Sequence, residues 1–228
     1  MVMKKYILSI DQGTTSSRVI LYNKNFKKID TLQKEFKQYF PKDGWVEHDA
    51  LEIWSDVKSL ISRIIKKNKI KSRDIISIGI TNQRETTVLW NKKTGKPINK
   101  AIVWQDRRTF NYCKKLIAEK KEPIIQKITG LLIDPYFSAT KIKWILENNK
   151  KAKKVFREGN LLFGTIDTWL LWNLSEKRSH LTDITNASRT MLFDLKKDQW
   201  SKKLLKLFKI PKTILPKVVE NVFDFGVT

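Results

Sequence analysis

The sequence contains a single cysteine, Cys113, among its 228 residues. An internal disulfide is therefore excluded, and so low a cysteine content fits a reducing compartment, which leads us to expect a cytoplasmic protein. No stretch approaches the run of about eighteen apolar residues that a membrane-spanning helix needs. The N-terminus has no small-residue cleavage site of the kind that ends a signal peptide. We expect neither membrane insertion nor a signal peptide.

Acidic residues are also scarce. The 23 Asp and Glu residues are outnumbered by 46 Lys and Arg residues, which gives a net charge of +23. A basic excess of this kind is the electrostatic footprint of a nucleic-acid binder. However, only 9 of the cations are arginines, the residue that reads bases and grips phosphates bidentately, and the 37 lysines are spread through every segment. We expect solvated lysine-rich faces and no nucleic-acid partner, with nucleic-acid binding kept as an alternative.

The chain has no P-loop motif, G-x-x-x-x-G-K-[ST], so a phosphate would have to be held in another way. A hydroxyl-rich turn at residues 11–17 separates two strand-like runs, residues 6–10 and 18–22. Its backbone N–H groups and four hydroxyls form an array that suits a phosphate. Gly13 would allow a positive φ and a close backbone approach. The alternative is an ordinary polar turn.

Two charged residues flank this turn. Asp11 would repel a phosphate directly, but it could hold one through Mg²⁺, which takes carboxylates, waters and phosphate oxygens together. Arg18 could stabilise charge on a phosphoryl group in transfer. The turn and its flanks therefore predict a phosphate site on a β-hairpin.

Hydrophobic periodicity predicts an α/β chain. A third strand is expected within residues 26–40, and Asp49 should cap a helix that ends near residues 67–68. Residues 75–80 are a near-continuous apolar run, typical of a buried parallel strand. Further strands are predicted at residues 86–90 and 101–104.

The second half of the sequence is predicted to be mostly helical. The expected helices cover residues 107–120, 122–129, 138–148, 166–174 and 200–208, and Gly130 should cap the second of them. No internal repeat, low-complexity tract or linker interrupts the sequence. One domain over residues 1–228 is the simplest division.

A second group of candidate site residues follows the predicted strand at 75–80. Arg84 and Glu85 place donors and acceptors side by side, which suits a small polyol whose hydroxyls both donate and accept. The pair would also neutralise itself, which limits the cost of burial. Trp104 could form an apolar wall against carbon, and Tyr136 could add a hydroxyl contact. A salt-bridged turn with core or rim aromatics is the alternative that these residues alone favour.

Several long segments together resemble the sugar-kinase family, from Tyr6 to the end of the chain. They are DQGTTSSR (11–18), GWVEHD (44–49), GITNQRETT (79–87), IVWQDRRT (102–109), GLLIDPYFS (130–138), LFGTIDTW (162–169) and TNASRTMLF (185–193). Residues 136–148 look like a signature of the wider family. The NQRE segment resembles the glycerol-phosphorylating branch more than the pentulose kinases.

The resemblance implies a ribonuclease-H-like (actin-like ATPase) domain, an α/β fold with a mixed sheet and flanking helices. ATP and glycerol would meet between two such domains. By position, the residues that would contact the ATP phosphates are Thr14, Thr15, Ser16 and Arg18. Asp11 would face Mg²⁺ through water. The residues that would bind glycerol are Arg84, Glu85 and Tyr136 by hydrogen bonds and Trp104 by packing on carbon. The reaction implied is in-line transfer of the γ-phosphoryl group to a terminal hydroxyl, which gives sn-glycerol 3-phosphate.

The chain departs from the family in its length. Members of the family are more than twice as long, and the segment with their catalytic Asp, the general base, would come after Thr228. We therefore expect an N-terminal domain, incomplete and inactive alone, with the second domain absent and a homo-oligomer in the full-length form. The alternatives are a non-catalytic remnant of a decayed or split gene and a related pentulose kinase.

Overall fold

The computed structural model describes residues 5–228, which form two compact units. Unit 1 comprises the described residues up to Gln38 together with Asp49–Gln83, and unit 2 comprises Tyr39–His48 and Arg84–Thr228. Residues 1–4 lie outside the described part of the chain. The single domain over residues 1–228 stays a prediction. In the described part of the chain, no helix combines the length and the apolar character needed to span a bilayer.

Unit 1 is built on a four-stranded mixed sheet. Its strands are β1 (Tyr6–Gln12), β2 (Ser16–Asn23), β3 (Lys28–Glu35) and β5 (Ile75–Asn82), in the order β3-β2-β1-β5. The pairs β1–β2 and β2–β3 are antiparallel, and β5 runs parallel to β1. The predicted strands and the mixed sheet are confirmed.

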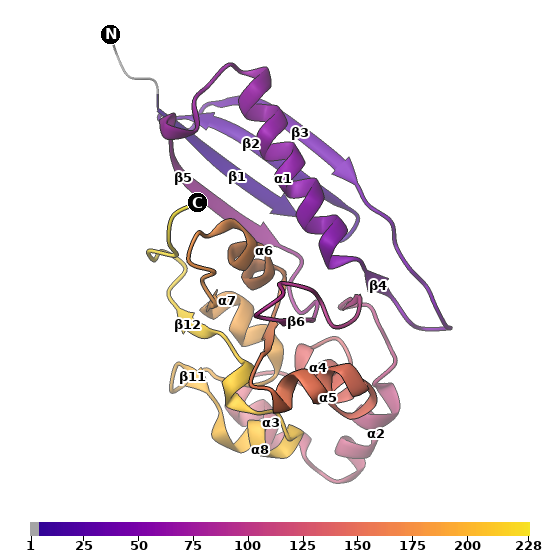
Figure 1. Cartoon of the computed structure of the whole chain (residues 1–228). Coiled ribbons are helices and arrows are strands. Elements are labelled where there is room, and N and C mark those ends of the chain that lie inside the picture. Colours follow the sequence, from indigo (N-terminus) through magenta and orange to yellow (C-terminus); the bar gives the residue numbers. More distant parts are fainter. Residues whose placement is uncertain (1–4) are drawn as a thin grey trace. The chain divides into compact units, whose positions relative to one another are not determined.

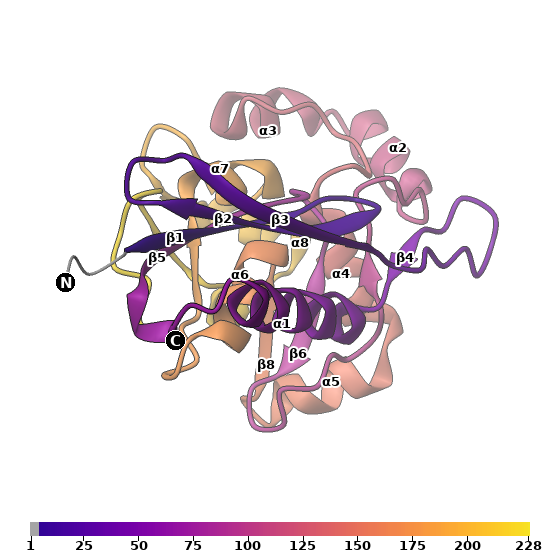
Figure 2. The ribbon, with the colours of Figure 1, turned by 90° about the horizontal axis from the view of Figure 1, so that it is seen from above.

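Helix α1 (Ala50–Lys67) lies across one face of this sheet (Figures 1 and 2). The predicted cap is present, because the Asp49 carboxylate accepts from the backbone N–H groups of Leu51 and Glu52. Alternation along β1 and β2 and the helical period of α1 bury one set of side chains. These are Leu8, Ile10, Val19, Leu21, Ile53, Val57, Leu60 and Ile64.

The predicted burial of β5 is wrong. Only half-buried and exposed residues make up the strand, and Ile76 is 56% exposed. β5 is the edge strand of the sheet, and α1 packs on β2 and β3 at the opposite side. The apolar run thus correctly predicts a parallel strand but not its surroundings.

Unit 2 combines short strand pairs with helices around one apolar core. Its strands are β4 (Glu47–His48), β6 (Val88–Asn91), β7 (Ala101–Ile102), β8 (Leu161–Gly164), β9 (Leu181–Asp183), β10 (Phe193–Asp194), β11 (Gln199–Trp200) and β12 (Lys217–Val219). Its α-helices are α2 (Phe110–Ala118), α3 (Glu122–Thr129), α4 (Ser138–Asn148), α5 (Lys150–Arg157), α6 (Ile166–Leu174), α7 (Ile184–Ala187) and α8 (Lys202–Phe208). Short 3₁₀ turns are η1 (Ser72–Asp74) in unit 1 and η2 (Ser188–Thr190) and η3 (Lys212–Ile214) in unit 2.

The five predicted helices of the second half are confirmed, and Gly130 ends α3 at a φ of 72° as expected. The sequence did not predict α5 or the strands β8 to β12. Most of these strands have two or three residues, too few for a period of two to show.

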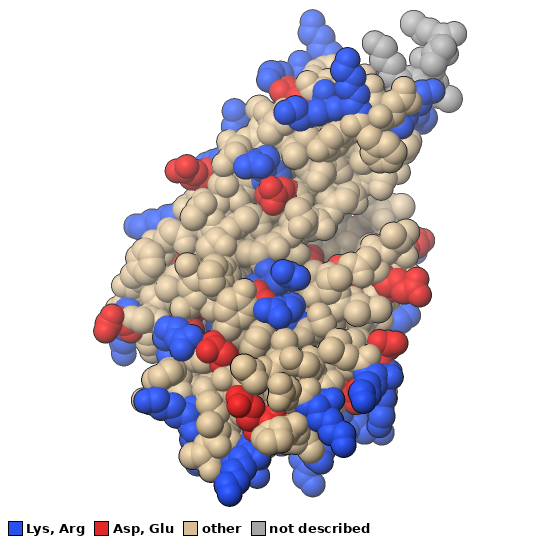
Figure 3. Space-filling model, turned by 180° about the vertical axis from the view of Figure 1, so that it is seen from behind, with Lys and Arg blue, Asp and Glu red and all other residues tan. Residues whose placement is uncertain are grey.

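Basic side chains are spread out on the face of the molecule that Figure 3 shows. Figure 3 shows Lys and Arg scattered over one face, with Asp and Glu among them. This distribution agrees with the spread of lysines along the sequence.

Candidate active site

The hydroxyl-rich turn of unit 1 is the tip of the β1–β2 hairpin. Gly13 N–H donates to Ser16 O at 2.9 Å, so Thr14 and Thr15 form the tip, and Thr15 is exposed. The predicted turn is confirmed, and Gly13 does not use the positive φ that a glycine allows. Gly13 lies at the base of the tip, where its N–H closes the hairpin, and this position does not require a left-handed backbone.

Glutamine side chains fix the carbonyl groups of this turn. Gly13 O accepts from the Nε2 atoms of Gln12 (2.7 Å) and Gln83 (3.0 Å), and Thr14 O accepts from Gln38 Nε2 at 3.0 Å. Gln12 and Gln83 also bond to each other at 3.1 Å. Because these carbonyl oxygens accept hydrogen bonds from side chains of unit 1, their partial negative charge is compensated inside the unit. The sequence analysis gave these three glutamines no role, although Gln12 and Gln83 stand in the segments DQGTTSSR and NQRE that it singled out.

Asp11 and Arg18 face each other in register across β1 and β2. Their closest atoms, Oδ2 and Nη1, are 3.5 Å apart, and the side chains are 39% and 40% exposed. Arg18 Nε donates to Gln33 Oε1 at 3.1 Å, and Gln33 Nε2 donates to Ser16 Oγ at 3.0 Å. An exposed ion pair this long is weak, so both charges stay accessible to a ligand while Gln33 orients Arg18 and Ser16.

In unit 2, Arg84 and Glu85 point into different environments. Arg84 is exposed, whereas Glu85 is 2% exposed and has a φ of 64°, a left-handed conformation that is uncommon for a residue with a side chain. The predicted mutual ion pair is wrong. The carboxylate of Glu85 instead pairs with Arg189, whose Nε donates to Oε1 at 2.7 Å. Burial raises the pKa of Glu85, and the bond from Arg189 opposes that rise.

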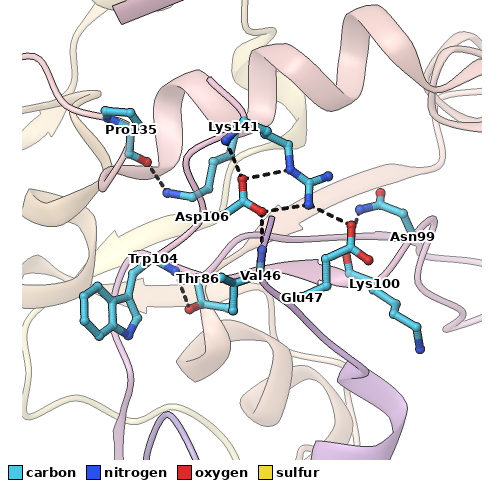
Figure 4. A network of polar contacts seen from close by, with 10 residues as sticks. Val46, Glu47, Thr86, Asn99, Lys100, Trp104, Asp106, Pro135 and Lys141 are labelled. Atoms are coloured by element: carbon cyan, nitrogen blue, oxygen red, sulfur yellow. Dashed lines mark hydrogen bonds and ion pairs between the residues drawn. The ribbon is translucent and has the colours of Figure 1, made fainter. Parts of the chain in front are cut away.

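Trp104 and Tyr136 form an aromatic surface. Their ring centroids are 5.2 Å apart, and both side chains are half-buried. The Tyr136 N–H donates to Asp134 Oδ1 at 2.7 Å, and Trp104 N–H donates to Thr86 Oγ1 at 3.3 Å. Figure 4 shows the indole of Trp104 pointing away from the neighbouring ion pairs.

Those ion pairs involve Asp106 and Arg108 of the segment 102–109. Asp106 is fully buried and accepts from Val46 N–H and from Arg108, which also bonds to Glu47 Oε1 at 2.7 Å. The Arg108 guanidinium lies 3.7 Å from the ring centroid of Trp45. With every one of these charges paired inside the fold (Figure 4), they form a structural network.

The structure thus brings Glu85, Trp104 and Tyr136 together, with Arg84 next to Glu85 in the chain. Arg189 connects the group, since its guanidinium lies 5.5 Å from the centroid of Tyr136 and bonds to Glu85. Sequence reasoning missed Arg189, although the segment 185–193 belongs to the resemblance. A long-range ion pair of this kind leaves no signal in local spacing.

Residues 6–228 match the FGGY family of carbohydrate kinases, N-terminal domain. The chain belongs to the FGGY family of carbohydrate kinases. It is 53% identical over 226 residues to a glycerol kinase of Treponema denticola, covering 99% of this chain and 46% of the relative. It is 54% identical over 216 residues to a glycerol kinase of Geobacillus sp. (strain WCH70), and this match covers 95% of this chain and 44% of the relative.

Solved structures confirm the fold of this FGGY domain. The crystal structure of Plasmodium falciparum glycerol kinase with ADP is 40% identical, has a TM-score of 0.92, and matches 98% of this chain and 44% of its own. Gluconate kinase from Lactobacillus acidophilus is 26% identical with a TM-score of 0.83, and the match covers 95% of this chain and 42% of that structure's chain. The predicted ribonuclease-H-like, actin-like fold is therefore confirmed. The chain spans about half the length of the relatives it matches.

Proposed function

We propose that the protein containing this chain phosphorylates glycerol with ATP to give sn-glycerol 3-phosphate. The observation that carries the proposal is the group in unit 2, where a buried carboxylate, an aromatic surface and an exposed arginine lie together. Such a group complements a small molecule with hydroxyls on a carbon chain. The glycerol kinases at 53% and 54% identity support glycerol over other polyols.

The hairpin of unit 1 would bind the nucleotide. Its turn offers N–H groups and the hydroxyls of Thr14, Thr15 and Ser16 to the ATP phosphates, while the turn carbonyls are bonded elsewhere. Arg18 would contact a nucleotide phosphate, since its guanidinium is accessible and oriented by Gln33. The related Plasmodium falciparum enzyme was crystallised with ADP, which supports a nucleotide ligand.

The carboxylate of Asp11 would help to hold Mg²⁺ beside the ATP phosphates. The described residues contain no group of three or more Asp, Glu, His or Cys side chains that could enclose a metal ion. Mg²⁺ in kinases needs no such enclosure, because phosphates, waters and one or two carboxylates suffice, and Asp11 is an accessible carboxylate next to the turn. When bound there, Mg²⁺ would neutralise charge on the phosphates.

The residues of unit 2 would orient the acceptor. Glu85 would accept a hydrogen bond from one hydroxyl of glycerol, and Arg84 and Tyr136 would bond to the others. Trp104 would cover the carbons and exclude water. With the acceptor fixed in line with the γ-phosphoryl group, positioning and charge stabilisation would supply most of the rate. None of these residues would act as the general base.

The test uses the protein expressed from its complete reading frame. ADP formation is measured with ATP and, in turn, glycerol, xylulose and gluconate. Turnover restricted to glycerol is the expected result. Preference for a pentulose would refute the assignment of Arg84 and Glu85, and absence of turnover with every acceptor would favour a non-catalytic remnant. Size-exclusion chromatography of the same sample tests the predicted homo-oligomer.

Replacing Arg84 gives the first specific prediction. Arg84→Ala should raise the KM for glycerol about 10- to 100-fold, because a hydrogen bond from a charged donor contributes about 1.5–3 kcal/mol. The KM for ATP should change little. Arg63→Ala, which removes an exposed arginine of α1, is the matched control and should leave both constants unchanged. An unchanged KM for glycerol in Arg84→Ala would remove Arg84 from the acceptor site.

A further inference from the structure

We infer that Arg189 is a positioning residue of the acceptor site, one that fixes the Glu85 carboxylate and the Tyr136 ring in a single arrangement. This inference rests on the proposed function. Arg189 belongs to η2 and lies 104 positions after Glu85 in the chain. Its Nε atom donates to Glu85 Oε1 at 2.7 Å. Its guanidinium lies 5.5 Å from the centroid of Tyr136 and 4.9 Å from that of Phe137.

Glu85 depends on such a partner because of where the backbone places it. The residue is buried and its φ of 64° is strained for a side chain of this size. Two hydroxyls fix its backbone, since Glu85 O accepts from Ser138 Oγ at 2.9 Å and from Thr87 Oγ1 at 3.2 Å. Arg189 fixes the side chain. Strain maintained by surrounding contacts is a feature of functional sites, where a side chain must keep one direction.

The bond from Arg189 leaves Glu85 able to bind a ligand. An ionised carboxylate has about four lone-pair positions, and the bond to Arg189 uses one position on Oε1. The charged groups that act on Glu85 are the cations Arg189, Arg84 and Lys141. Of these, Arg189 has the largest effect, and it favours the ionised form of Glu85, which can accept a hydrogen bond from a hydroxyl group.

The same guanidinium also fixes the aromatic surface. A planar guanidinium can stack on rings while it donates in its plane, which a lysine ammonium cannot do in the same geometry. Tyr136 contacts Trp104 at 5.2 Å and Phe137 at 5.3 Å between centroids. Through Arg189, the carboxylate and the ring surface become one rigid unit.

The segment that carries Arg189 is itself well fixed. Asp183 caps helix α7, since its carboxylate accepts from the Asn186 N–H at 2.7 Å. Ser188 Oγ donates to Thr185 O at 3.0 Å, and Met191 ends η2 with a φ of 62°. Through these contacts the segment TNASRT (185–190) holds Arg189 in position to bond to Glu85.

The first experiment compares Arg189→Met and Arg189→Lys in the protein from the complete reading frame. Arg189→Met should raise the KM for glycerol at least about tenfold, with the KM for ATP nearly unchanged. The rise should become larger as the pH is lowered, because the buried carboxyl without its arginine partner gains a proton more readily. Arg189→Lys retains the charge and should suppress that pH dependence while the KM stays elevated. Arg178→Met, at an exposed arginine of the same unit, is the control.

A second measurement is independent of turnover. The titration of Glu85, followed by carboxyl-carbon NMR without substrate, should move up by at least about one pH unit in Arg189→Met. An unmoved titration, or a KM for glycerol that is unchanged at every pH, would overturn the inference. A wild-type protein that ignores glycerol but shows the NMR shift would refute the proposed function and with it the acceptor role of Arg189, leaving the ion pair as structural. Arg189→Lys keeps the test valid if Arg189→Met fails to fold.

Discussion

A buried lysine supports the loop that carries Tyr136. Lys141 is fully buried in α4, and its Nζ donates to the carbonyl oxygens of Pro135, Tyr136 (2.8 Å) and Phe137 (3.4 Å). Burial lowers its pKa to about 7, against which Asp106 and Glu85 act weakly. The loop is therefore held to the helix by a buried amine whose charged form is costly to bury.

This lowered pKa predicts how stability depends on pH. Between about pH 7 and about pH 10, unfolding takes up a proton at Lys141, so the free energy of unfolding should rise with pH by up to about 1.4 kcal/mol per unit. Lys141→Met lacks this term. The unfolding free energy of the wild type minus that of Lys141→Met should therefore rise from about pH 7 to about pH 9, as measured by urea titrations.

Lys127→Met is the control for this measurement, because Lys127 is exposed on α3. Its difference from wild type should stay constant with pH. Parallel pH curves for wild type and Lys141→Met would contradict the lowered pKa of the buried lysine.

At the scale of elements, the junction between β8 and α6 is closely packed around Gly164. A Cβ atom at this position would lie 2.6 Å from Thr168 Cβ of α6 and 3.0 Å from the Trp90 ring of β6. The strand pair β6–β8 and helix α6 thus approach each other through a glycine. The sequence pattern did not reveal this contact, since β8 has only four residues.

Gly164→Ala should consequently destabilise the fold by roughly 1–3 kcal/mol, the usual cost of forcing a methyl group into a packed core. Thermal or urea unfolding measures the change. Gly79→Ala on β5 is the matched control, because its added Cβ would meet nothing within 4 Å, and it should be close to neutral. Equal stabilities of the two variants would show that the junction relaxes without cost.

At the scale of the whole molecule, the net charge of +23 causes repulsion between like charges, which lowers the stability of the folded state. Lys and Arg on the face in Figure 3 are mixed with Asp and Glu but outnumber them two to one in the sequence. Added salt screens this repulsion, whose range falls from about 30 Å at 0.01 M to about 8 Å at 0.15 M.

The melting temperature should therefore rise by several degrees as sodium chloride increases from about 0.01 M to about 0.3 M. Differential scanning fluorimetry measures it. Potassium chloride at the same ionic strength is the control and should act equally, since screening does not depend on the cation. A melting temperature that falls or stays constant would show that favourable ion pairs outweigh the general repulsion.

The sequence by itself determined the hairpin, helix α1, five helices of the second half and the resemblance to the sugar-kinase family. The hairpin and the helices follow from local chemistry, namely a hydroxyl-rich turn, periodicity and a capping Asp49, whereas the family follows from the resemblance of long segments such as DQGTTSSR (11–18). It also placed Glu85, Trp104 and Tyr136 as site candidates, and the structure brings these three together.

Only the tertiary structure decided the partners. It gave Glu85 the distant Arg189 in place of the adjacent Arg84, engaged the turn carbonyls with Gln38 and Gln83, and left β5 at the edge of its sheet. The physical reason is that burial and ion pairing depend on which segments meet in space. Those meetings are set by the packing of many residues at once, and no short stretch of sequence contains them.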